Sequence, residues 1–335
     1  MIILRTVKNI SSLNIAASVL LFLAAILAAV VANSSLSPVY QDFLLQELHL
    51  RIGNFNLFSH GGHPLKMIEF INDCLMTVFF LAVGLEIKRE LLVGELSSVR
   101  KAALPFIAAC GGMVVPVVIY ALSVASGTPE TRGMAIPMAT DIAFSLGVLS
   151  LLGKRVPLSL KIFLTAFAVV DDIGGILVIA LFYSADVSYG YLIAAAVLYV
   201  FLYYMGKFGV TQKIFFLFFG VIIWYLFLQS GIHSTISGVI LAFVIPARPR
   251  LDAGKYIERI RDIIGEFPVS KSDNIVLTNA QIATLKQVER ASDYVISPLQ
   301  SLEDNLHGAV SFVILPLFAF ANAGVVFSGS GSIVG

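Results

Sequence analysis

Long, almost unbroken apolar runs dominate the pattern of residues along this chain. Nine such stretches lie near residues 12–32, 67–86, 102–125, 134–152, 158–183, 188–206, 213–229, 231–246 and 308–327. Most of them reach or approach the roughly 20 residues that an α-helix needs to cross a bilayer. The runs are continuous rather than alternating, and a backbone in hydrocarbon must satisfy its own hydrogen bonds. The pattern therefore predicts nine transmembrane helices.

Composition places the protein in the all-α, polytopic membrane class. Hydrophobic residues make up 58% of the chain and charged residues 13%, whereas a soluble globular domain has about 25% charged residues. The net charge of +1 gives no sign of a nucleic-acid partner. We therefore expect a single membrane domain over residues 1–335, surrounded by membrane lipid.

Two connections are longer than simple turns. Residues 34–65 contain "LRIGNFNL", in which alternating apolar residues flank a Gly-Asn pair, and this pattern predicts a β-hairpin. Residues 247–307 are more polar, and apolar residues recur there at helical spacing, as in "YIERIRDIIGEF". This second segment is predicted to form amphipathic helices at the membrane surface.

Basic residues in the connections predict the orientation. With the N-terminus in the cytoplasm, the outer connections hold only Arg51, Lys66 and Arg132, as the positive-inside rule requires. The cytoplasmic connections then hold Lys88, Arg89, Arg100, Lys101, Lys154, Arg155, Lys207, Lys213, Arg248 and Arg250. The predicted hairpin is therefore outside, and the amphipathic segment 247–307 is cytoplasmic.

Four carboxylates fall inside the predicted spans, at Asp73, Asp141, Asp171 and Asp172. An ionised carboxylate at the bilayer centre costs roughly 2.5–3.5 kcal/mol, so each needs a partner or a role. The adjacent pair in "AVVDDIGG" projects in directions about 100° apart on a helix. Mutual repulsion and burial favour proton uptake by at least one of the two, which suits a group that exchanges a proton for a cation. A neutral, hydrogen-bonded structural role is the alternative, above all for Asp73.

The fourth predicted span contains a helix-breaking sequence, "MAIPMATDIAFSLG". Pro137 removes a backbone donor, and Thr140 and Asp141 are favoured N-cap residues for a helix that restarts after it. One interpretation is a helix broken within the membrane, of the kind that forms ion sites in secondary transporters. The other is a proline kink with Thr140 bonded to its own helix. Carboxylate, hydroxyl and carbonyl oxygens suit a small hard cation such as Na⁺ or Li⁺.

Several motifs in order resemble the NhaA-type sodium/proton antiporters of bacterial inner membranes. They are "FFLAVGLEIKREL", "ATDIAFSLGVLSLLG", "AVVDDIGGILVIALFY", "SGIHSTISGVI" and "LPLFAFANAGV". The resemblance implies an NhaA-like fold with a discontinuous helix and an inverted repeat. It also implies a multi-pass, pH-regulated, electrogenic transporter rather than an enzyme. Such a protein exchanges Na⁺ or Li⁺ for protons in sodium and pH homeostasis and uses no cofactor.

The resemblance also assigns roles to individual residues. Asp172 matches the principal cation-binding aspartate of the family, and Asp171 matches its neighbour in the same Na⁺ site. Thr140 and Asp141 match the polar pair at the break of the fourth helix. A charged cytoplasmic cluster linked to pH response is matched by Glu86, Arg89, Glu90, Glu303 and His307. The outer hairpin, residues 50–57, resembles the family's dimer contact and implies a homodimer.

One departure from the family bears on activity. The family has twelve spans, and only nine are predicted here. The last three carry the partner broken helix and a lysine that neutralises the site. We therefore expect only part of the inverted repeat, and a non-transporting fragment or sensor-like paralogue is the alternative function. An intramembrane aspartyl protease fits poorly, because its G-x-G-D and Y-D motifs are absent from the sequence.

Overall fold

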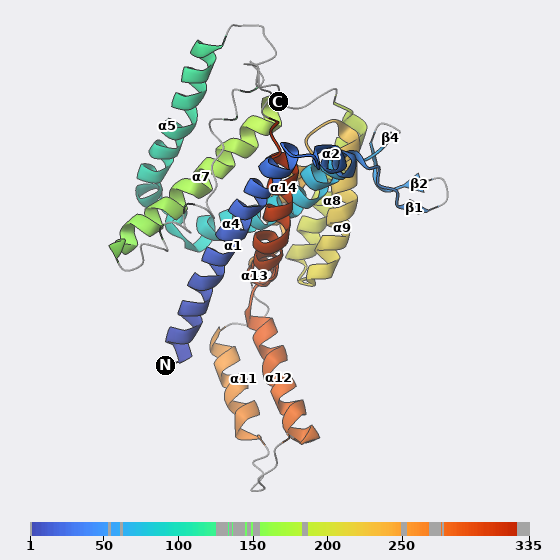
Figure 1. Ribbon diagram of the computed structural model, residues 1–335. Coiled ribbons are helices and arrows are strands. Elements are labelled where there is room, and N and C mark those ends of the chain that lie inside the picture. The colour runs from blue at the N-terminus through green and yellow to red at the C-terminus, as the bar shows by residue number, and fades with distance from the viewer. Residues whose placement is uncertain are drawn as a thin grey trace.

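The structure is a computed structural model of the chain. It describes residues 2–52, 55–60, 63–124, 155–182, 187–248, 253–267 and 278–326, together with the single residues 133, 136, 145, 149 and 276. The described part is mostly helical, which confirms the predicted class, and long helices lie side by side in one bundle (Figure 1).

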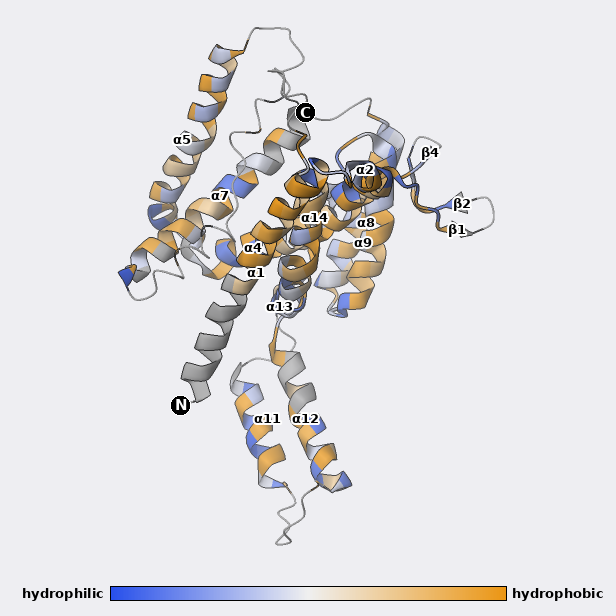
Figure 2. Ribbon diagram, in the orientation of Figure 1, coloured by the Kyte–Doolittle hydropathy of each residue, from blue (hydrophilic) through white to orange (hydrophobic). Residues whose placement is uncertain are grey.

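The helices follow the apolar runs of the sequence. In chain order they are α1 (Ile2–Ala32), α2 (Ser37–Leu45), α3 (Met67–Glu69), the π-helix η1 (Phe70–Leu75), α4 (Met76–Val93), the 3₁₀ turn η2 (Glu95–Ser97), α5 (Val99–Ser123), α7 (Leu158–Phe182), α8 (Tyr189–Lys207), α9 (Lys213–Ser230), α10 (Thr235–Val244), α11 (Ala253–Gly265), α12 (Asn279–Val295), α13 (Pro298–Ala309), the π-helix η5 (Val310–Ile314) and α14 (Leu315–Asn322). Figure 2 shows that the helices of the bundle are mostly apolar, whereas α11 and α12 mix apolar and polar residues.

Five helical runs among the described residues are long and apolar enough to cross a membrane. They are 67–93, 99–123, 189–207, 213–230 and 298–322. A sixth candidate combines Ala16–Ala32 with α2 and is bent by 113°. The predicted number of nine spans is not confirmed, since most of the predicted span 134–152 lies outside the described residues.

Two predicted spans differ from the structure. The run 231–246 forms only the ten-residue helix α10, because Gly231 adopts a left-handed conformation (φ 80°) that ends α9 and starts a turn. Ten residues rise about 15 Å, half the hydrocarbon thickness. The last helical run begins at Pro298, ten residues earlier than predicted, because Ser297 caps its first turn.

The helices α4 and α10 cross at close range. A Cβ atom on Gly84 would lie 2.8 Å from Cβ of Ala242, and one on Gly238 would lie 2.3 Å from the carbonyl oxygen of Thr77. Only glycine allows such an approach. Next to this crossing, buried side chains from α4, α8, α9, α10 and α13 form the largest apolar cluster.

Two smaller features lie at opposite ends of the bundle (Figure 1). In one, β1 (Arg51–Ile52) pairs with β2 (Phe55–Asn56) in antiparallel register, and β3 (Ser59–His60) pairs with β4 (His63–Pro64). In the other, α11 and α12 pack together and extend away from the remaining helices.

Candidate ion-binding site

The adjacent carboxylates lie in the middle of α7. Asp171 is buried, with 4% of its surface exposed, whereas Asp172 is half-buried. Each takes part in a polar or electrostatic interaction. The preceding residues Val169 and Val170 are also buried. The two neighbouring acids therefore have different surroundings, one enclosed by packed side chains and the other more accessible.

Side chains from α4 and α5 pack directly against the part of α7 that carries the acids. Val83 of α4 and Val169 belong to one buried cluster, and Ile173 packs against it. On the α5 side, a Cβ atom added to Gly174 would lie 2.0 Å from the sulfur of Met113. Gly174 therefore lets Met113 approach the helix, and the position of the acids depends on α4 and α5.

The second predicted part of the ion site cannot be placed. Thr140 and Asp141 lie outside the described residues, so the discontinuous helix stays a prediction. Among the residues that the structure does describe, no group of three or more His, Cys, Asp or Glu side chains could hold a metal ion.

Charged side chains gather where α4 meets α13. Nε of Arg89 donates a hydrogen bond to Oε1 of Glu303 at 3.0 Å, and its Nη2 lies 3.5 Å from Oε1 of Glu90. Glu86, one turn earlier on α4, interacts electrostatically with all three. Four of the five residues assigned to pH response are thus neighbours. His307 lies one turn beyond Glu303 and is exposed.

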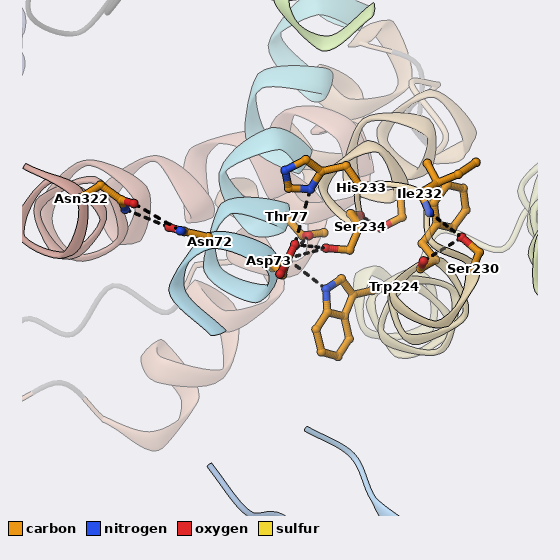
Figure 3. Close-up of polar contacts among 11 residues, drawn as sticks. Asn72, Asp73, Thr77, Trp224, Ser230, Ile232, His233, Ser234 and Asn322 are labelled. Carbon is orange, nitrogen blue, oxygen red and sulfur yellow. Dashed lines mark hydrogen bonds and ion pairs between the residues drawn. The ribbon is translucent and has the colours of Figure 1, made fainter. Parts of the chain in front are cut away.

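Asp73 is the centre of a polar network that links η1 to α9 and α10 (Figure 3). Its carbonyl oxygen accepts hydrogen bonds from Thr77, from Nε1 of Trp224 at 3.0 Å and from the Ser234 hydroxyl at 3.1 Å. Its carboxylate Oδ1 accepts a hydrogen bond from the Ser234 hydroxyl at 3.1 Å and lies 3.4 Å from Nδ1 of His233. A π-helix leaves carbonyls without their usual helical donors, and such irregular turns are frequent at functional sites.

Sequence reasoning identified Asp73 as an intramembrane acid but found no partner for it. The motif "SGIHSTISGVI" holds two of its partners, His233 and Ser234. Lys88 was noted only as a basic connecting residue. In the structure its Nζ donates to carbonyl oxygens of the last turn of α10 and of the residue after it.

The fold and the site together define a class of protein. Several apolar helices form one bundle, one of them carries two adjacent acids, and an ion-paired cluster lies near the end of another. Ionisable groups within membrane helices mark ion and proton pathways. The chain is therefore a multi-pass membrane protein with the features of an ion transporter.

Comparison with known proteins identifies the family. A family model described as Na⁺/H⁺ antiporter 1 matches residues 8–334, so the chain belongs to this family of transporters. The Na⁺/H⁺ antiporter NhaA of Bacteroides thetaiotaomicron is 76% identical over 335 residues, which are 100% of this chain and 76% of the relative. The NhaA protein of Phocaeicola vulgatus is 63% identical over 300 residues, 90% of this chain and 67% of the relative. That of Porphyromonas gingivalis is 47% identical over 331 residues, 97% of this chain and 73% of the relative.

Proposed function

We propose that this protein exchanges Na⁺ or Li⁺ from the cytoplasm for external protons, and that Asp171 and Asp172 bind the two ions in turn. Membership of the Na⁺/H⁺ antiporter family supports the exchange. The observation that carries the choice of site is the adjacent pair of acids on α7, one buried and one half-buried. We expect the exchange to need no cofactor.

The two acids have different roles in this proposal. Asp172, the more accessible of the pair, is the essential cation ligand, because a transported ion must reach its carboxylate from water. Asp171 is enclosed and acts mainly as a proton carrier in this proposal, next to the carboxylate of Asp172. Thr140 and Asp141 complete the oxygen ligands.

Competition between protons and the cation drives the cycle. Protonation from one side expels Na⁺, and Na⁺ binding from the other side expels protons. If two protons leave for each Na⁺, net charge moves, and a membrane potential contributes about 2.3 kcal/mol per charge per 100 mV. We therefore expect electrogenic exchange that responds to the potential and to the pH gradient.

The charged cluster at α4 and α13 is proposed to set the pH response. The Arg89–Glu303 ion pair joins the two helices, and Glu86 and Glu90 lie within its electrostatic field. A proton gained or lost by this cluster changes the attraction between α4 and α13, and α4 packs against α7. His307, on the exposed face of α13, adds a titratable group one turn away.

We further propose a bacterial inner-membrane location with the N-terminus in the cytoplasm. The excess of basic residues in the connections on that side supports this orientation. The β1–β2 hairpin then lies outside, where residues 50–57 are proposed to join two copies into a homodimer.

Ion flux in everted membrane vesicles tests the proposed exchange. Addition of Na⁺ should release protons from acidified vesicles that contain the protein. The Asp172→Asn variant should give no release, whereas Asp42→Asn, at an exposed position of α2, should behave like the unmodified protein. Vesicles with well-inserted protein that show no Na⁺-dependent proton release would instead support the sensor-like alternative.

A further inference from the structure

The short helix α10 has two ends that need partners within the bundle. It covers only Thr235–Val244, about 15 Å, so it cannot reach both surfaces of a hydrocarbon core of about 30 Å. The first four N–H groups and last four carbonyls of a helix lack intrahelical partners. They carry partial charges that favour an anion at the start and a cation at the end.

An anion lies at the beginning of α10. The Asp73 carboxylate accepts a hydrogen bond from Ser234, the residue that precedes the helix, and lies 3.4 Å from Nδ1 of His233 (Figure 3). Both residues belong to the turn that follows α9, in which Gly231 has a left-handed conformation. The Ser234 side chain makes no capping bond to its own helix.

A cation lies at the end of α10. Nζ of Lys88 donates to the carbonyl oxygen of Phe243 at 2.7 Å, to that of Ala242 at 3.3 Å and to that of Ile245. These carbonyls belong to the last turn of α10 and to the residue after it. The ammonium group therefore compensates the negative end of the helix.

Both charges come from the same neighbouring run, η1 and α4. Asp73 and Lys88 are 15 positions apart, about 22 Å along a helix, which is enough to reach both ends of α10. The two helices run in the same direction, since the earlier residue meets the start of α10 and the later one meets its end. Parallel helix dipoles do not offset each other, so the side-chain charges supply the compensation.

We propose that Asp73 and Lys88 are positioning residues for ion exchange: they fasten the two ends of α10 to α4, and the joined helices hold the part of α7 that carries the carboxylate pair. The close crossing at Gly84 and Gly238 completes this attachment. This proposal rests on the proposed function in one respect: the transported ions bind at Asp171 and Asp172 on α7.

Contacts on α7 connect the joined helices to the acids. Val83 and Ile87 of α4 form a buried cluster with Val169, and Val239 of α10 and Ile173 pack against that cluster. Val169 precedes the acids and Ile173 follows them. Any movement of α10 relative to α4 therefore changes the surface on which this segment of α7 is held.

Removal of the Lys88 charge tests the proposal. Lys88→Met should raise the apparent Km for Na⁺ about three- to tenfold, the effect of losing one well-placed charge at a helix end, with a smaller change in maximal rate. Lys88→Arg keeps a cation and should retain most of the Na⁺ affinity. The matched control is Lys207→Met, at an exposed lysine in the last turn of α8, and its Km should be unchanged.

A spectroscopic measurement separates positioning from activity. Trp224 is the only tryptophan of the chain and donates to the Asp73 carbonyl, so its emission reports on this junction without any transport. Lys88→Met and Asp73→Asn should both shift its emission to longer wavelength. Lys88→Gln, which can still donate a hydrogen bond but has no charge, should be intermediate and replaces Lys88→Met if that variant does not fold.

The outcomes distinguish the inference from the proposed function. If the unmodified protein binds and exchanges no Na⁺, the proposed function fails, and the emission shifts still test the attachment of α10. If the unmodified protein exchanges Na⁺ but Lys88→Met or Lys88→Gln matches Lys207→Met in Km and emission, the positioning role is overturned. A loss of maximal rate at unchanged Km would also contradict it.

Discussion

The crossing of α4 and α10 yields a prediction whose size follows from the geometry. A Cβ atom on Gly238 would lie 2.3 Å from the Thr77 carbonyl oxygen and 3.0 Å from the Leu81 nitrogen. Both are backbone atoms, so no side chain can rotate away. Ordinary van der Waals contact begins at 3.4 Å, so the two helices must separate by about 1 Å. A gap of this size removes a quarter to a half of the dispersion energy of each contact.

Gly238→Ala should destabilise the protein despite the better helix propensity of alanine. Overpacking costs about 1–3 kcal/mol, and alanine recovers up to about 1 kcal/mol in a helix. Because two backbone atoms are crowded, we expect a net loss of about 1–2 kcal/mol in the free energy of unfolding. The control is Gly111→Ala on α5, where an added Cβ meets nothing within 4 Å; it should be neutral or stabilising.

Thermal unfolding of the detergent-purified protein measures both variants. A loss of this size corresponds to a fall in the unfolding midpoint of about 1.5–3 °C, since an unfolding entropy of about 2.1 cal/mol/K per residue amounts to about 0.7 kcal/mol/K for 335 residues. The midpoint of Gly238→Ala should lie below that of the unmodified protein, and that of Gly111→Ala should not. Equal midpoints for the two variants would refute the conclusion that α4 and α10 lie too close together at Gly238 for a larger residue.

Three further predictions concern the ion site, the charged cluster and the hairpin. Asp141→Asn should raise the apparent Km for Na⁺ while some exchange remains, because other oxygen ligands stay in place; a well-inserted variant with no exchange would contradict this. Arg89→Gln should lower the free energy of unfolding by about 1–3 kcal/mol, as expected for a lost hydrogen bond between charged groups. The double variant Arg89→Gln, Glu303→Gln should recover part of this loss in the same thermal assay. Deletion of residues 50–57 should convert purified dimers to monomers in light scattering, and an unchanged mass would exclude the hairpin as the dimer contact.

Much of the helical architecture could be predicted because the physical signal is local. The apolar run 213–229 corresponds to α9 at Lys213–Ser230, and the run 102–125 corresponds to α5 at Val99–Ser123. The predicted helix boundaries were wrong where the composition of the residues near the boundary does not indicate it. The turn after Gly231 that shortens α10 lies within a continuous apolar run. The first turns of the last helical run, after Pro298, contain polar residues and therefore do not resemble a membrane span.

In the candidate site too, features within one stretch of sequence could be predicted, whereas contacts between distant stretches could not. Asp171 and Asp172 stand out because charge interrupts an apolar run. The partners of Asp73 and Lys88 could not be inferred in this way. Trp224 is 151 positions from Asp73, and Phe243 is 155 positions from Lys88. Such pairs form only when helix packing brings them together, and a π-helix such as η1 has no distinctive composition.

Calorimetric titration of Na⁺ into the purified protein at two pH values distinguishes the roles of Asp171 and Asp172. Asp172→Asn keeps the shape of the side chain but removes the charge that attracts the cation, so it should show no Na⁺ binding at either pH. Asp171→Asn leaves one carboxylate at the site, so weak binding should survive with fewer protons released per Na⁺. Asp42→Asn serves as the control and should bind like the unmodified protein. If Asp171→Asn abolishes Na⁺ binding while Asp172→Asn preserves it, the assignment of the cation ligand and the proton carrier on α7 is contradicted.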